Sequence, residues 1–132
     1  MWVMDISPKV FSKVKTEGTK NLKSKYPNIF FTTLNKVQTN PKFPTVYVHE
    51  VGTTEQGQDL ENKEINAVLA TFQIDVTDNE NQNNANKVMG EVVRIMKTMG
   101  FSVVNMPEFQ SVEDVYRLTA RFRRMIGQGD IF

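Results

Sequence analysis

The sequence predicts a single α+β domain, with two helices beside a mostly antiparallel sheet in the order α-β-β-β-α-β-β. Three observations lead to this prediction. Residues 114–127 alternate apolar and polar side chains, which indicates a half-buried strand. Residues 85–99 repeat apolar side chains every three or four positions, which is typical of an amphipathic helix. The length of 132 residues suits one domain spanning residues 1–132.

The first helix is predicted over residues 7–25. Ser7-Pro8 is typical of a helix start, with serine as the N-cap and proline in the first turn. Tyr26-Pro27 ends the helix, because the residue before a proline is disfavoured in the α region. Two segments rich in β-branched and aromatic residues follow, and we expect strands at 29–34 and 45–51.

The stretch from Gly52 to Lys63 is polar, contains two glycines and has no apolar period. Stretches of this length in compact domains are usually functional or mobile. We therefore predict a flexible arm at about 52–63 that reaches a neighbouring subunit, and a mobile hairpin tip without a partner is the alternative. The candidate contact residues of this arm are Thr53, Thr54, Glu55, Gln56, Gln58, Asp59 and Glu61.

The second half of the chain continues with a long strand predicted at 64–77. A polar segment at 78–84 caps the second helix, and Gly100 is the expected stop at its C-terminal end. A short strand at 101–105 and a turn at 106–113 then lead into the closing strand.

The closing strand carries four arginines that we single out as a candidate basic face. Arg117, Arg121 and Arg123 fall on its polar side, whereas Arg124 falls on its apolar side and breaks the alternation. These side chains are candidates to line a lumen or to pair with acidic residues of an adjacent subunit. The alternative is that these arginines simply form a solvent-exposed face that keeps the sheet soluble.

Arginines on a sheet can also contact phosphates, so a nucleic-acid-binding module is a further alternative. Against this alternative, we expect no exposed aromatic residues interleaved with the arginines, where bases would stack. The formal net charge of +1 also argues against a free-standing nucleic-acid binder.

Charge is segregated along the chain despite this near-neutral balance. Before residue 43 there are eight lysines against two acidic residues, whereas residues 50–80 hold eight acidic residues against Lys63 alone. An ordinary solvated surface is sufficient to explain any single one of these charge clusters. The sharper hypothesis is that copies stack head to tail, basic patch on acidic patch, because complementary potentials set the register between subunits.

The sequence offers no constellation of catalytic residues, so we expect no enzymatic activity, no cofactor and no metal. There are no cysteines, and His49 is the only histidine, which excludes the usual paired metal sites. The glycines lack the context of a phosphate-binding loop. No run of about 18 apolar residues and no signal peptide are present, so we expect a protein without a membrane contact, made in a reducing cytoplasm.

Several pieces, taken in order, carry a family resemblance. They are Phe-Pro-Thr-Val-Tyr-Val at 43–48, Phe-Gln-Ile-Asp-Val at 72–76, a helix ending Met-Gly-Phe at 99–101, and Arg-Phe-Arg-Arg-Met-Ile-Gly at 121–127. In this order and length the chain resembles the tail-terminator, or tail-to-head joining (tail completion), proteins of long-tailed bacteriophages. The resemblance covers nearly the whole chain and includes no catalytic motif.

The resemblance implies a structural virion protein at the junction of tail and head, made in the cytoplasm of the host bacterium. Such proteins form a homo-hexameric ring that caps the tail tube, ends tail polymerisation and offers the head-docking surface. The implied partners are further copies of the chain, the major tail tube protein and the head-completion or connector protein. Genomic DNA would pass through the lumen without sequence-specific binding. A head-completion or neck protein on the connector side is the closest alternative.

Overall fold

The computed structural model describes residues 2–33, 42–56, 66–112 and 115–132. It confirms the predicted α+β class, with two helices and a five-stranded mixed sheet. A short 3-10 turn precedes the first helix. In chain order the elements are η1 (Trp2–Asp5), α1 (Ile6–Leu22), β1 (Phe30–Thr32), β2 (Thr45–Gln56), β3 (Ala67–Asp78), α2 (Gln82–Thr98), β4 (Ser102–Val112) and β5 (Val115–Gly127).

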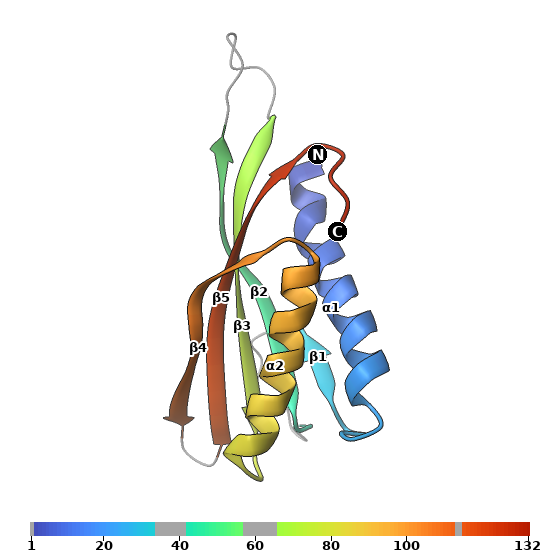
Figure 1. The fold of residues 1–132 in the computed structure, drawn as a ribbon, viewed down its shortest axis with the longest axis vertical. Helices are drawn as coiled ribbons and strands as arrows, with labels where there is room; N and C mark the ends of the chain where they lie inside the picture. The colour runs from blue at the N-terminus through green and yellow to red at the C-terminus, as the bar shows by residue number, and fades with distance from the viewer. Residues whose placement is uncertain (1, 34–41, 57–65, 113–114) are drawn as a thin grey trace.

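The sheet has the strand order β1-β2-β3-β5-β4. The short strand β1 runs parallel to β2, and all other neighbours are antiparallel. Both helices lie on the same side of this twisted sheet, so the described residues form two layers, and no helix among them covers the other face of the sheet (Figure 1).

The core lies between these two layers. Alternate residues of β3 point into it, and Phe72 and Ile74 are fully buried there. Phe122 of β5 pairs directly with Phe72 and is also fully buried. The helices contribute apolar stripes, with Val10 and Val14 from α1 among the buried residues. The buried residues of the strands recur every two positions, and those of the helices recur every three or four. Both sets pack against each other in one apolar layer.

Gly18 allows α1 to lie close to the sheet. A Cβ atom at this position would stand 2.5 Å from Cζ of Phe31, a ring of β1 that is almost fully buried. A glycine in the middle of a helix costs about 1 kcal/mol relative to alanine. Here that cost is offset by the close approach of the helix to Phe31.

The ends of α2 follow the sequence signals. The side chain of Asn81 accepts a hydrogen bond from the backbone N–H of Asn84 (2.8 Å), as an N-cap should. At the other end, Gly100 adopts a positive φ of 87°, and the N–H of Phe101 donates to the carbonyl of Met96 (3.1 Å). This is the Schellman arrangement that glycine permits. The predicted stop at Gly100 is confirmed. The predicted N-cap of α1 at Ser7 is wrong, since that helix begins at Ile6.

The loop structure expected at 52–63 is wrong for its first five residues, whereas an arm that reaches a neighbouring subunit stays a prediction. Residues 52–56 continue β2, which is paired with residues 67–71 of β3 after an irregularity between Glu50 and Gly52. The remaining arm positions, 57–63, lie outside the described residues. Cross-strand pairing with β3 outweighs the polar composition that suggested a loop, because strand propensity depends strongly on the neighbouring strand.

The predicted turn at 106–113 is also wrong for residues 106–112. They continue β4, which runs antiparallel to β5 with two register shifts. Pro107 fits within this strand because β4 lies at the edge of the sheet, where a missing N–H breaks no ladder. Within the described residues no helix is long and apolar enough to cross a membrane.

Candidate interaction surfaces

We call the side of the sheet that lacks helices the open face. Its central rows run across β2, β3 and β5. Tyr47 lies opposite Asp75, which lies opposite Thr119, and the next row contains His49, Gln73 and Arg121. These two rows of the open face are therefore polar, with two aromatic rings at their β2 end.

A buried carboxylate organises this face. Asp75 is only 4% exposed. Its Oδ2 accepts a hydrogen bond from the Arg117 guanidinium (3.0 Å), and its Oδ1 accepts one from the Thr119 hydroxyl (2.7 Å). Gln73 also donates to Oδ1 at 3.3 Å. A buried charge needs such partners. Arg117, a predicted site residue, thus forms a cross-strand ion pair with Asp75 between β5 and β3.

The two other arginines of the open face are less constrained. Nε of Arg121 donates to the Gln73 side-chain oxygen (3.0 Å), which leaves the terminal nitrogens of this exposed guanidinium without a partner among the described residues. Arg123 is exposed, and its side chain has no hydrogen-bond or ion-pair partner in the described part of the chain. These two side chains are the ones able to meet an external anion.

Arg124 does not belong to this face. It pairs with Ala70, a buried core residue, and therefore points to the side of the helices. Its Nη1 donates to the carbonyl of Met99 at the C-terminal end of α2 (2.9 Å), and it forms an ion pair with Asp130 at 3.6 Å. Its guanidinium also lies 5.1 Å from the centre of the Phe132 ring. A cation is favourable at a helix C-terminus. The prediction that Arg124 shares a basic face with the other three is corrected.

The aromatic rings of Tyr47 and His49 were missed by sequence reasoning. They stack at 4.5 Å between centroids with a 17° angle between planes. Both residues are half-buried on the open face, and β3 separates them from the arginines of β5. They therefore do not contradict the expectation of no exposed aromatic residues interleaved with the arginines. The signal was available, because positions 47 and 49 are separated by the strand period of two.

The predicted arm residues that the structure describes do not share one surface. Thr53 and Glu55 pair with Ala70 and Val68, which face the helices. Thr54 and Gln56 lie on the opposite side, and the Gln56 amide donates to the Thr54 hydroxyl at 3.4 Å. A regular strand alternates its side chains in this way. The other arm candidates, Gln58, Asp59 and Glu61, lie outside the described residues.

Displaced pKa values occur where the helices meet the rest of the domain. Burial, with a smaller contribution from the charge of Asp78, raises the pKa of Tyr26. A hydrogen bond from Arg94 lowers the pKa of Glu91, which also accepts a hydrogen bond from the side chain of Asn21 (2.8 Å). This second bond joins α1 to α2. These shifts have a structural explanation.

Comparison with known proteins gives no relative. Among the described residues, no group of three histidine, cysteine, aspartate or glutamate side chains could hold a metal ion. A scan against protein-family models found no matching family, and a search of curated proteins found no match.

Proposed function

We propose that this chain is a structural virion protein that caps a phage tail tube as a ring of identical copies. It would end tail polymerisation there and provide the surface that docks the head. Its partners would be further copies of itself, the tail tube protein and a connector protein of the head. The basis of the proposal is the resemblance described above, together with features of the fold.

The observation that supports the proposal best is the long ladder between β2 and β3. Eleven residue pairs hold these strands together. Their paired ends extend past the end of α2 (Figure 1). In the sequence these strand ends flank an acidic stretch, whereas α1 carries lysines. Unlike patches on one chain favour head-to-tail contacts, which close into rings.

The open face supports a second part of the proposal, that the ring lumen passes DNA. Arg121 and Arg123 have donors without described partners, and the Arg117–Asp75 pair keeps the sheet beneath them ordered. Two arginines per copy would give the lumen a modest positive potential. That potential suits transit of a phosphate backbone without sequence-specific binding.

Negative-stain imaging tests the proposed function directly. The purified protein is imaged alone and after mixing with tail tubes assembled from the same phage. We expect tubes closed at one end and held to a uniform length, with rings visible in end views. Uncapped tubes with an unchanged length distribution would refute the proposal. Binding to isolated connectors without any effect on tubes would favour the head-completion alternative.

A nucleic-acid-binding module remains the second candidate, because the stacked rings of Tyr47 and His49 lie on the same face of the sheet as Arg121, two strands away. Such a module should bind oligonucleotides as a monomer, with an affinity that falls steeply as salt rises. Arg121→Ala combined with Arg123→Ala should then abolish binding, whereas Arg124→Ala on the other side of the sheet serves as the matched control. Under the tail-terminator proposal the monomer should show no such binding.

A further inference from the structure

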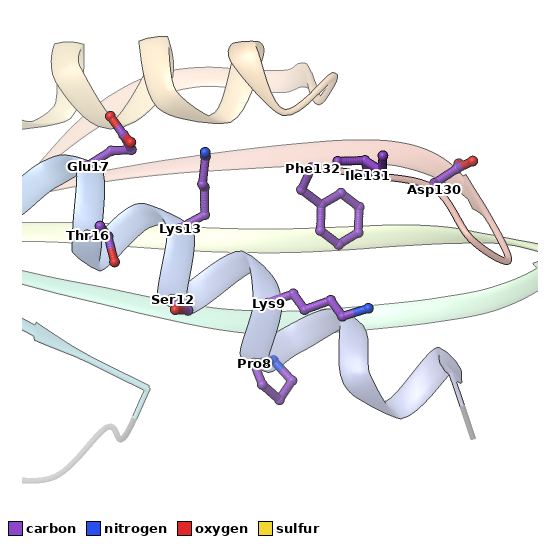
Figure 2. Close-up of a pocket in the computed structure, with 9 residues that line it drawn as sticks. All are labelled: Pro8, Lys9, Ser12, Lys13, Thr16, Glu17, Asp130, Ile131 and Phe132. Atoms are coloured by element: carbon purple, nitrogen blue, oxygen red, sulfur yellow. The ribbon is translucent and has the colours of Figure 1, made fainter.

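A groove of about 580 Å³ lies along the first turns of α1 and is closed on its other side by the C-terminal segment (Figure 2). Pro8, Lys9, Ser12 and Lys13 line it from α1, and Ile131 and Phe132 line it from the C-terminal segment. Ile131 is 89% exposed. The groove therefore combines apolar side chains with two lysines on one wall.

The C-terminal wall of the groove is held in place by specific contacts. Asp130 accepts a hydrogen bond from the N–H of Gly127 (2.8 Å) and forms the ion pair with Arg124. The Phe132 ring lies over the same guanidinium and packs against the core. The charge of Asp130 is therefore balanced at least in part by Arg124.

The two lysines of the groove are available to a ligand. Neither Lys9 nor Lys13 has a hydrogen-bond or ion-pair partner among the described residues. Glu17 lies at the far end of the lining, two helical turns beyond Lys9, so the positive stretch is confined to the start of α1. An exposed apolar surface flanked by cations fits a segment that presents carboxylates on both sides of an aliphatic residue.

The chain itself contains such a segment. Residues 52–65 hold four carboxylates and a single lysine, and Leu60 stands between Asp59 and Glu61. We propose that the groove binds the acidic β2–β3 arm of a second copy of this chain. This inference rests on the proposed function and deepens it, because it names the surface that joins neighbouring copies.

A second copy is the occupant we choose, and not the arm of the same chain. The described ends of β2 and β3 lead along the sheet past the end of α2 (Figure 1), whereas the groove lies between α1 and the C-terminal segment (Figure 2). Contacts between unlike surfaces of successive copies are the kind that a ring requires. The same charge complementarity would set the register of the copies.

Cysteine cross-linking tests the contact, because the chain has no cysteine of its own. One variant carries Ser12→Cys in the groove and the other carries Gln58→Cys in the arm. They are mixed in the presence of tail tubes and oxidised. We expect a disulfide-linked heterodimer. Gln110→Cys on the exposed part of β4, mixed with Gln58→Cys, is the matched control and should give background yield.

Charge reversal adds a specific signature. Lys9→Glu with Lys13→Glu in the groove variant should lower the heterodimer yield about tenfold, as expected for two exposed ion pairs. Asp59→Lys with Glu61→Lys in the arm variant should restore it. A heterodimer yield no higher than that of the Gln110→Cys control would overturn the inference. A yield that neither charge reversal changes would also overturn it. A cross-link formed within one chain by the Ser12→Cys, Gln58→Cys double variant, with none between chains, would also overturn it.

Cross-linking and imaging of tube length together distinguish failure of this contact from failure of the proposed function. Tubes that are capped at uniform length without any groove-to-arm cross-link would refute the contact and leave the tail-terminator proposal standing. Cross-linked copies that leave tube length unchanged would support the contact and count against tube capping.

Discussion

The two faces of the sheet are built from the same alternating strands but have different chemistry. The face under the helices is apolar, with Phe72 and Phe122 fully buried at its centre. The open face contains polar rows organised by Asp75, together with two arginines that have unused donors. The covered face stabilises the fold through burial, which depends little on direction. The open face depends on individual hydrogen bonds, so its order is local and its free groups are available for partners.

The largest loss of stability should come from a substitution on the covered face. Phe72→Ala removes a fully buried ring and should lower the free energy of unfolding by about 3–5 kcal/mol. Urea denaturation measures this change. Thr71→Val, the neighbouring residue on the open face, is the control and should change stability by less than about 0.5 kcal/mol. Equal losses of stability at the two positions would contradict the conclusion that the covered face stabilises the fold more than the open face does.

The Asp75 network should give the next largest effect. Asp75→Ala leaves Arg117 and Thr119 without their shared acceptor and should cost about 1–3 kcal/mol. A double-mutant cycle with Arg117→Ala isolates the pair. We expect a clear coupling energy between these two residues and almost none between Asp75 and Arg123. A zero coupling for the first pair would show that the open face is ordinary solvated surface.

Arg123 and Arg124 allow a further comparison of the two faces, because they are adjacent in β5 and their side chains point to opposite sides of the sheet. Arg124→Ala loses the hydrogen bond to the end of α2 and the packing on Phe132, so we expect a cost of about 1–2 kcal/mol. Arg123→Ala should cost less than about 0.5 kcal/mol. Thermal unfolding of both variants under identical conditions measures the difference. The reverse order would contradict the placement of the two side chains.

The smallest effect concerns the pH dependence of stability and involves Glu91, which joins α2 to α1. The pKa of Glu91 is lowered in the folded state from its ordinary value near 4.5, chiefly by the hydrogen bond from Arg94. Its contribution to stability is therefore present above this value and is lost as pH falls through the lowered pKa. Since Arg94 is exposed, solvent screens this pair and the contribution to stability should be small.

The measurement is a comparison of Glu91→Gln with the unsubstituted protein across pH 7 to 3. The two unfolding free energies should differ at neutral pH and converge in acid. A gap that widens as the pH falls would contradict the sign of the shift.

Local periodicity determined a large part of this fold. The alternation in residues 114–127 and the three-to-four spacing in residues 85–99 identified β5 and α2, since each reflects only the geometry of its own backbone. Gly100 marked the end of α2 for the same reason, because only a residue without a Cβ adopts that φ at low cost. These features need no knowledge of which strands are neighbours.

Pairing between distant segments determined the rest. Residues 52–56 are too polar to indicate a strand by themselves, and they form one because β3 offers a ladder. Pro107 argues against a strand until β4 is known to lie at an edge. The Asp75–Arg117 pair joins residues 42 positions apart, and the groove joins α1 to the C-terminal segment.

The candidate surfaces divide in the same way. The sequence by itself determined that the arginines cluster on one strand, that α1 is basic and that residues 50–80 are acidic. Only the tertiary structure decided that Asp75 engages Arg117, that Arg124 supports α2, and that Lys9 and Lys13 lie beside an apolar groove. The physical reason is that charge and periodicity are properties of consecutive residues, whereas a binding surface requires the partners that folding brings from elsewhere in the chain.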